Sequence, residues 1–583
     1  MRTDENRIYR NGVETFQKRT SKRRRFFSTG RTIKDILHKE HDYCIIQLSI
    51  FGVYHSDRGI GMRTFKESLE QSKKQLYLAL AATFIWGIWT HGYGFLHDSF
   101  SKDSLSEFYG AAGGSAWKIQ LGRVIVPIYR QIFRTELTLP WMIGLLSLLW
   151  IGLAVYLTAR IFKVQSKLSL VLIAGIFTAN ITVAATAASY SHDYDCDMFA
   201  MLCSVCAVYC WKDLRFGWLI GAVFVAISLG IYQSYISVAI VLVMFVCILA
   251  LLDGELFLPV LGRGLKAVGM LLLGGVIYYI LMRSVLAATG ITLASGDTNS
   301  LDSALTLSVG EIIYLTYHAY ADCVSRLLNV VSPYPAALVR GITLVLMIFC
   351  AGILVWGLCR RKLGWLERLL CMGLIALIPL GMNLIYIPTH AIVHDLMVYA
   401  IWLFYLLVVL LGDWFAQCHR NSSETNGEDL RKQPRKLSMA LLAVLLYGNM
   451  QTANVLYLKK DMEQDAYLSL MTRIVYRMET FDEYEPGVTP VVFVGEHTML
   501  NDCIPGFEPY TGITGMDTAV VATTGEDYRL RSYFQTVMNI PVVVPGGDVY
   551  NAMKTDPAVA AMPAYPEEGC IALLDGVLVV KLS

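Results

Sequence analysis

Long stretches of apolar residues without charge determine most of what this chain can fold into. The sequence has 583 residues, of which 55% are hydrophobic and only 16% are charged, whereas an ordinary soluble domain has about 25% charged residues. The charged side chains are concentrated between the apolar stretches. A bilayer imposes this pattern, because a helix needs about twenty predominantly apolar residues to cross its hydrocarbon core. The sequence therefore predicts a polytopic α-helical membrane protein.

About eleven stretches have the length and apolarity of a membrane-spanning helix. They lie near residues 76–96, 138–161, 168–190, 194–211, 217–233, 235–252, 267–288, 335–358, 368–388, 392–411 and 437–457. The regions hardest to divide are 168–211 and 217–252, because in the second region two spans would share a very tight turn. The predicted organisation is a tail at 1–74, a transmembrane region at 75–457 and a C-terminal domain at 458–583.

Lys and Arg residues predict the orientation, because short cytoplasmic loops carry an excess of both. The tail is basic and contains Lys22-Arg23-Arg24-Arg25, so the N-terminus is expected in the cytoplasm. The connections that would then also be cytoplasmic contain Arg160, Lys163, Lys167, Lys212, Arg215, Arg263, Lys266, Arg360, Arg361, Lys362, Arg368, Arg420, Arg431, Lys432, Arg435 and Lys436. An odd number of spans places residues 458–583 outside the cytoplasm.

One connection runs against this rule. It contains Lys118, Arg123, Arg130 and Arg134, although it would face the outside. This loop is long and follows the first span, so it weakens the predicted orientation without reversing it.

The other ionisable residues are unevenly distributed between the two sides. The predicted outer connections contain His97, Asp98, Asp103, His192, Asp193, Asp195, Asp197, Glu311, Asp322, His390, His394 and Asp395. Ionisable residues at the edge of a span are costly and often mark a polar cavity. Ordinary loop polarity explains any single one of them equally well, but it explains the set less well, because the inner loops contain mostly cations. Chemistry is therefore expected on the outer side.

The thirteen cysteines show neither a disulfide framework nor a metal-binding pattern. Cys203, Cys206 and Cys210 have the spacing of ligands, but they lie in an apolar run, where a cysteine is usually a small hydrophobic residue. Cys503 and Cys570 both fall in the predicted soluble segment and are expected to pair if the compartment is oxidising. The net charge of +2 gives no indication of nucleic-acid binding.

The residues after the last predicted span have the pattern of a small α/β domain. Residues 491–495 and 541–545 have the composition of short strands, and 528–538 has helical spacing. Residues 570–582 contain two apolar runs around Asp575-Gly576, which is a strong hairpin signal. Neither GxGxxG nor GxxxxGK[ST] follows the first strand, which argues against a nucleotide site. The domain is expected to cover a membrane cavity or to help bind an acceptor.

Several short motifs occur in a fixed order relative to the predicted spans. They are His97-Asp98-Ser99, Leu121-Gly122-Arg123, Pro140, Tyr194-Asp195, Gly230-Ile231-Tyr232-Gln233-Ser234, and Met562-Pro563-Ala564-Tyr565-Pro566 followed by Gly569 and the hairpin. Together they resemble the bacterial and phage O-antigen glucosyltransferases of Gtr type II, which are polytopic GT-C-like enzymes. The resemblance covers about residues 75–583. The family more often has an acidic pair in place of His97-Asp98, which leaves open which carboxylate leads the chemistry.

The resemblance implies a multi-pass glycosyltransferase of the bacterial inner membrane. Such an enzyme moves a sugar, expected to be glucose, from a polyprenyl-phosphate donor to a surface glycan on the outer face. An outer site has no access to cytoplasmic nucleotide sugars, so a membrane-borne donor supplies the activated sugar. The implied partners are this donor, the glycan acceptor and the bilayer, without nucleic acid. No cofactor is certain, and a divalent metal stays open.

Inverting transfer requires a carboxylate that takes the acceptor proton and a cation that stabilises the departing phosphate. Asp98 is the first candidate for the base, and Asp193 and Asp195 are the alternatives. Arg123 suits the phosphate because a guanidinium binds oxyanions in a bidentate manner. Its other interpretation is an arginine that extends to the membrane interface.

The remaining candidates are expected to contact substrate. His97 and His394 are weaker candidates for the phosphate. Tyr232 and Gln233 are candidates because they belong to the motif Gly230-Ile231-Tyr232-Gln233-Ser234. Trp117, Tyr232 and Tyr317 have the aromatic rings that stack on sugars, although membrane interfaces are rich in aromatic residues anyway.

Three other classes of function stay open. A transporter or flippase needs a polar pathway at broken helices, for which Gly274-Gly275 and Pro379 are candidate breaks. A polysaccharide polymerase or ligase uses similar donors and is not distinguished by these residues. A non-catalytic scaffold leaves the outer His and Asp residues unexplained.

Overall fold

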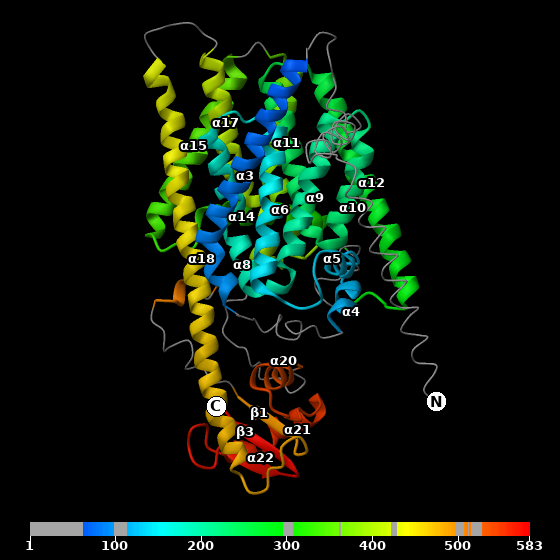
Figure 1. Cartoon of the computed structure of the whole chain (residues 1–583), viewed down its shortest axis with the longest axis vertical. Coiled ribbons are helices and arrows are strands. Elements are labelled where there is room, and N and C mark those ends of the chain that lie inside the picture. The colour runs from blue at the N-terminus through cyan, green and yellow to red at the C-terminus, as the bar shows by residue number, and fades with distance from the viewer. Residues whose placement is uncertain are drawn as a thin grey trace, which may run out of the picture. The chain divides into compact units, whose positions relative to one another are not determined.

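The computed structural model describes residues 62–97, 113–294, 307–360, 363–420, 428–495, 506–510, 512–514 and 528–583. Most of this part of the chain is helical (Figure 1). The long helices are α3 (Met62–Leu96), α6 (Pro140–Ile161), α9 (Tyr194–Asp213), α11 (Ile236–Leu252), α12 (Phe257–Thr289), α14 (Val309–Leu328), α15 (Ala336–Arg360), α16 (Trp365–Met382), α17 (Leu403–Arg420) and α18 (Glu428–Glu479). One large apolar core connects α3 through α18.

A helix lies at each of the eleven predicted stretches. Within the described residues, seven helices are long and apolar enough to cross a membrane, and a bent pair gives an eighth. The seven are Pro140–Ile161, Gln233–Leu252, Phe257–Thr289, Ala336–Cys359, Trp365–Met382, Tyr399–Cys418 and Gln433–Glu479. Helices α3 and α9 are not among them, and α10 (Gly217–Ile231) is shorter. The mostly helical architecture is confirmed, and the long apolar helices are compatible with a multi-pass membrane protein, while the count of eleven stays a prediction.

The bent pair consists of α7 (Lys167–Thr178) and α8 (Ile181–Ser189), which meet at an angle of 40°. Asn180 stabilises the bend, because its Oδ1 accepts a hydrogen bond from the backbone N–H of Val183 at 3.0 Å. Its Nδ2 donates to the carbonyl of Ile176, also at 3.0 Å. The short turn η2 (Ser191–Asp193) then connects α8 to α9. The bend and the turn together bring polar residues into the end of the helical core.

Helices α10 and α11 are joined by a very tight connection, as the sequence predicted. Only Tyr232 and the short turn η3 (Gln233–Tyr235) separate them. Gly230 ends α10 against Ile125, and a Cβ at this position would lie 2.7 Å from the Cγ1 of Ile125. The glycine is therefore required by the close approach of two segments.

The region after α16 differs from the sequence prediction. The predicted span at 392–411 lies at Tyr399–Cys418 in the structure, and short turns η4 (Leu384–Tyr386), η5 (Asp395–Met397) and η6 (Tyr399–Trp402) precede α17. His390 and Ala391 have φ values of 49° and 70°. Inside the predicted span, His394 has an extended backbone with φ −87° and ψ 154°, which an α-helix does not contain, so α17 begins later. The sequence analysis also did not predict α14, which begins with a capping box formed by Ser308 and Glu311.

The C-terminal residues contain the predicted strands. Strands β1 (Val491–Val494), β2 (Ile571–Leu574) and β3 (Val577–Lys581) form a sheet of order β1-β3-β2. Strand β3 pairs parallel to β1 and antiparallel to β2. Asp575 and Gly576 both have positive φ, as a two-residue hairpin turn of type I′ requires. The predicted strand at 541–545 is reduced to a single bridge between Pro490 and Val543.

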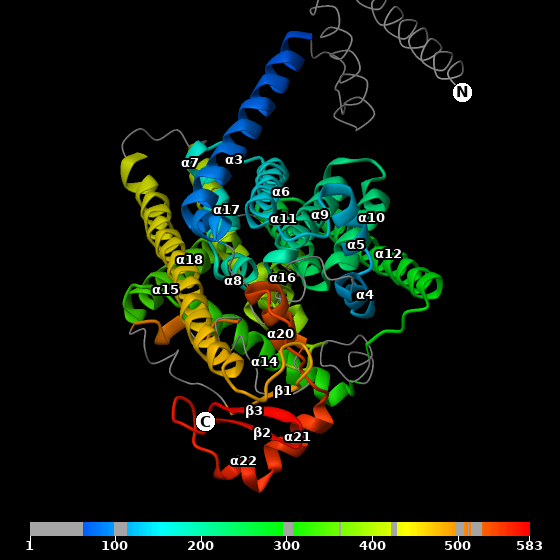
Figure 2. The ribbon, with the colours of Figure 1, turned by 60° about the horizontal axis from the view of Figure 1, so that its bottom comes forward.

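Both faces of this sheet are covered. Val491, Phe493 and Val580 lie in an apolar cluster with the end of α18, α20 (Tyr528–Ser532) and the π-helical turns Tyr533–Met538. The alternate residues of β1 and β3 pack against α21 (Gly547–Thr555) and α22 (Pro557–Ala561) (Figure 2). The small α/β module is thus present in these residues. Its independence as a domain stays a prediction.

Candidate active site

Three buried aspartates lie where η2 leads into α9. The side chains of Asp193, Asp195 and Asp197 belong to residues that are 3%, 0% and 5% exposed. Residues four apart share one face of a helix, so Asp193 and Asp197 lie near each other, while Asp195 points to another side. A buried carboxylate is costly unless it is paired, so the partners of each one decide its role.

Asp193 is held by two cations. Its Oδ1 accepts a hydrogen bond from the guanidinium of Arg130 at 2.9 Å, and its Oδ2 is paired with the ammonium of Lys118. The Nε2 of His192 lies 3.4 Å from the same Oδ2. Burial by itself would raise the pKa of Asp193, but Lys118, His192 and Arg130 outweigh burial and hold this pKa well below its usual value. Asp193 is therefore an ionised member of a buried network.

Asp195 is paired just as fully. Its Oδ2 accepts from the Nε of Arg134 at 2.9 Å, with both side chains at most 1% exposed, and its Oδ1 accepts from the N–H of Cys196 at 3.0 Å. Arg134 also donates to the carbonyls of Thr135 and Leu137, each at 3.1 Å, and to that of His192. Both partners are thus saturated with hydrogen bonds.

The cations come from the connection that seemed to be an exception to the orientation rule. Lys118 lies on α4 (Gly113–Gln120), Arg130 on α5 (Val126–Phe133), and Arg134 caps the end of α5. Gly122 has a φ of 75° in the turn between the two helices. The sequence analysis missed the ion pairs between these cations and the aspartates. The signal was that four cations and three aspartates were predicted on the same side of the membrane.

Aromatic side chains fix α5 in place. Tyr129 and Phe133 contact the rings of Trp150 and Phe199, with centroids 4.8–5.6 Å apart within this group. The indole N–H of Trp150 donates to the hydroxyl of Tyr129 at 2.8 Å. These contacts join α5 to α6 and α9, so Arg130 and Arg134 are presented by a rigid support.

Arg123 is the fourth cation, and it is bound differently. Its guanidinium stacks over the ring of Tyr232, 4.3 Å from the centroid, and its Nε is buried without a hydrogen-bond partner. The segment carrying Arg123 is fixed to the turn after α10: the N–H of Ile125 donates to the carbonyl of Gly230 at 2.9 Å. Gln233 donates to the carbonyl of Leu121 at 3.4 Å and to the hydroxyl of Tyr278 at 3.1 Å. Two motifs that are far apart in the sequence therefore meet here.

Asp197 lies on the same side as Arg123. It interacts electrostatically with Arg123, Tyr232 and Tyr235, yet in the described part of the chain it makes no hydrogen bond or ion pair. The buried hydroxyls of Tyr232 and Tyr235 also have no partner. This side of the cluster holds an anion, a cation and two hydroxyls whose hydrogen-bonding capacity is unused.

The comparisons with known proteins decide the family. Residues 92–411, more than half of the chain, match the family model described as glucosyl transferase GtrII. The chain belongs to this family. No curated protein and no solved structure matches it. The matched region contains the whole charged cluster, from Lys118 to Tyr235, so the cluster lies within the glucosyl transferase part of the chain.

The structure shows no hydrogen bond or ion pair between the other described site candidates and the charged groups of the cluster, and one candidate cannot be placed. Asp98 lies outside the described residues. The ring of His97 stacks on Tyr93 with centroids 3.9 Å apart, and its Nδ1 bonds the carbonyl of the same residue. His394 is exposed. Trp117 and Tyr317 are 42% and 71% exposed.

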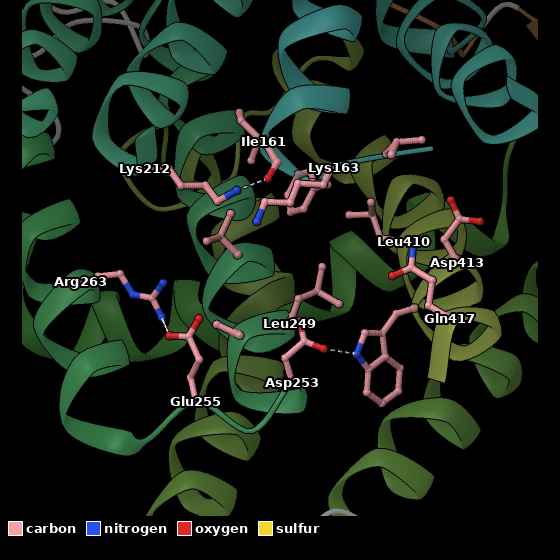
Figure 3. A pocket seen from close by; sticks show the side chains of 15 residues that line it. Ile161, Lys163, Lys212, Leu249, Asp253, Glu255, Arg263, Leu410, Asp413 and Gln417 are labelled. Carbon is pink, nitrogen blue, oxygen red and sulfur yellow. Dashed lines mark hydrogen bonds and ion pairs between the residues drawn. The ribbon is translucent and has the colours of Figure 1, made fainter. Parts of the chain in front are cut away.

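A cavity of about 220 Å³ lies at the other end of α9 (Figure 3). It is lined among others by Lys163, Lys212, Asp253 and Asp413, and none of the predicted site residues borders it. Lys212 is near the end of the 20-residue helix α9, about 25–30 Å from the aspartates at its start. Among the described residues, no group of three His, Cys, Asp or Glu side chains has a geometry that suits a metal ion.

The structure describes one of the two cysteines that were expected to pair. Cys570 is buried with a free thiol, and the guanidinium of Arg477 lies 3.6 Å from its Sγ. Cys503 lies outside the described residues, so its pairing with Cys570 stays a prediction.

Proposed function

We propose that this protein transfers glucose from a polyprenyl-phosphate donor to a surface glycan, with inversion, at the outer face of the bacterial inner membrane. Membership of the GtrII family supports glucosyl transfer, and seven long apolar helices support a multi-pass membrane protein. The donor, the acceptor and the orientation belong to the proposal. The observation that carries it is the buried charged cluster between α4, α5 and the start of α9.

The cluster has the groups that transfer from a phosphate-linked sugar requires. Arg123 is a partly buried residue whose Nε is buried and has no hydrogen-bond partner, and a guanidinium stabilises a departing phosphate best where water is excluded. Lys118, Arg130 and Arg134 neutralise Asp193 and Asp195 and fix the helices around this position. Tyr232 adds an aromatic face and a hydroxyl.

A contact of α8 supports the proposed side of the membrane. The hydroxyl of Ser189, two residues before η2, donates to the carbonyl of Thr514 at 2.9 Å. The cluster and this part of the C-terminal region therefore share one end of the helical core. Because the basic tail and loops predict a cytoplasmic N-terminus, we assign this end to the outside.

A transporter or flippase is less well supported. Gly274 and Gly275 lie inside the uninterrupted helix α12, and Pro379 lies in the last turn of α16. Neither predicted break interrupts a helix at mid-length, where a transporter binds its substrate. A polymerase or ligase uses the same kind of donor, so the acceptor distinguishes it from the proposed enzyme.

Sealed vesicles of known orientation test the proposal. They carry the full chain and polyprenyl-phosphate [¹⁴C]glucose in both leaflets, and the glycan acceptor is added outside. We expect single glucose units to be added to the glycan in right-side-out vesicles and not in inverted ones. Arg123→Lys should reduce the rate without abolishing it, because the charge remains while the bidentate geometry is lost.

Three outcomes would contradict parts of the proposal. Transfer only in inverted vesicles would refute the orientation. Movement of the labelled lipid between leaflets without any glycan product would favour a flippase. Lengthening of the glycan by whole repeat units would favour a polymerase.

A further inference from the structure

We propose that Asp197 is the carboxylate that takes the proton from the acceptor hydroxyl. This inference rests on the function proposed above and names a catalytic residue that the sequence analysis did not select. The buried cluster has two halves. In one half the aspartates form ion pairs and hydrogen bonds, and in the other half the aspartate forms neither with the described residues.

The paired half contains Asp193 and Asp195 with their cations. Both oxygens of Asp193 are bound, by Arg130 at 2.9 Å and by Lys118. Both oxygens of Asp195 are bound as well, by Arg134 at 2.9 Å and by the N–H of Cys196 at 3.0 Å. The oxygens of both carboxylates already accept hydrogen bonds from the protein, so neither is free to accept one from an incoming acceptor hydroxyl.

The open half contains Asp197, Arg123, Tyr232 and Tyr235. Within the described residues, the carboxylate of Asp197 accepts no hydrogen bond, and the Nε of Arg123 and both tyrosine hydroxyls are buried without a partner. Each buried unsatisfied polar group costs about 1–3 kcal/mol. Three such groups beside a carboxylate that accepts no hydrogen bond from the described residues are explained if a polar ligand satisfies them, and the ligand must present both a negative charge and hydroxyls.

A sugar phosphate and a glycan hydroxyl meet this description. Arg123 offers its unpaired donor to a phosphate, and Tyr232 and Tyr235 offer hydroxyls to sugar oxygens. Tyr232 and Tyr235 are 3% and 0% exposed, so the ligand would be enclosed. Asp197 is 5% exposed and interacts electrostatically with Arg123, as Asp193 does too.

The proposed transfer is a single displacement at the anomeric carbon of the donor sugar. The acceptor O–H gives its proton to the carboxylate of Asp197 while the acceptor oxygen forms a bond to the anomeric carbon of the donor sugar. The bond between that carbon and the phosphate oxygen breaks, and its electron pair leaves with the polyprenyl phosphate. Arg123 stabilises the charge that develops on this phosphate.

Asp197→Asn is the decisive variant, because the amide has nearly the same shape and cannot take the proton. We expect the rate of glucose transfer at saturating donor and acceptor to fall about 10²–10⁴-fold, the usual contribution of a general base. The KM for the donor should change little. Asp197→Glu should recover part of the rate. Asp461→Asn is the matched control, since Asp461 accepts a hydrogen bond from Tyr93 instead; its rate should be unchanged.

A second variant keeps the inference testable if Asp197→Asn does not fold. Tyr232→Phe keeps the ring on which Arg123 stacks and removes a hydroxyl that makes no hydrogen bond of normal geometry with the described residues, so folding should be preserved. The value of kcat/KM should fall about tenfold, because one hydrogen bond to the ligand is lost.

The outcomes separate this inference from the proposed function. If the wild type transfers glucose and folded Asp197→Asn does so at the same rate, Asp197 is not the base although the function stands. Tyr232→Phe at the wild-type kcat/KM would show that the open half does not bind substrate. A wild type without any transfer would instead refute the proposed function.

Discussion

The chain contains the same dipeptide, His-Asp, at two described places that the sequence treats alike. His192-Asp193 precedes α9, and His394-Asp395 precedes α17, each in a predicted outer connection. In the structure, the side chain of Asp193 is 4% exposed and bound to two cations. The side chain of Asp395 is 20% exposed and bound to one cation, Arg326, at 2.7 Å.

The second dipeptide joins segments of the protein. Asp395 accepts hydrogen bonds from the N–H and the hydroxyl of Thr514 at 3.0 and 3.3 Å, and its carbonyl accepts from Thr182 on α8. It therefore attaches the C-terminal segment to α8 and α14. The comparison teaches that burial and the number of paired cations, which a dipeptide does not encode, separate a charged core from a tether.

Replacing Asp193 should have the largest effect on the stability of the protein. Asp193→Asn should remove the charge with which both Lys118 and Arg130 pair, and breaking a buried ion pair typically costs about 3–5 kcal/mol. Arg130 keeps a longer ion pair with Glu136, at 3.4 Å. We expect a strong decrease of the thermal unfolding midpoint in detergent, measured by intrinsic fluorescence. The double variant Lys118→Met/Asp193→Asn should recover part of the loss. An unchanged midpoint in the single variant would show that the cluster does not stabilise the fold.

A smaller effect is expected for Asp395. Asp395→Asn should cost about 1 kcal/mol, because hydrogen bonds to a charged group are worth about 1.5–3 kcal/mol when buried and solvent reduces this value here. Faster amide hydrogen exchange in residues 512–514 should report release of the tether. If exchange there stays slow while the site residues are perturbed, Asp395 belongs functionally with Asp193 and the comparison fails.

The smallest effect is expected for His394. Its side chain is exposed and forms no contact in the described part of the chain, so His394→Ala should change stability by no more than about 0.5 kcal/mol. The glucose-transfer assay decides whether it has a separate role. A large decrease in the rate at normal stability would mean that His394 binds the donor phosphate, as its sequence position suggested.

The sequence by itself determined the features that depend on local patterns. Stretches of about twenty apolar residues predicted helices, because a helix of that length spans a bilayer and satisfies its backbone hydrogen bonds within the segment. Asp575-Gly576 predicted the hairpin, because both positions need positive φ. The tight connection before α11 and the order of the family motifs were also readable. The start of α17 was not, because the extended residue His394 and the short turns η5 and η6 that follow it lie in a stretch as apolar as a helix.

Only the tertiary structure decided which charges meet. Arg130 and Asp193 are 63 residues apart, and Arg134 and Asp195 are 61 apart, and no local periodicity relates such positions. In the sequence, Asp193, Asp195 and Asp197 look equivalent, and Arg123 looks like one more cation of its loop. Folding pairs two of the aspartates completely and leaves Asp197 beside Arg123 and two unpartnered tyrosine hydroxyls. The distinction arises because burial makes each unpaired polar group costly, and burial is a property of the packed helices as a whole.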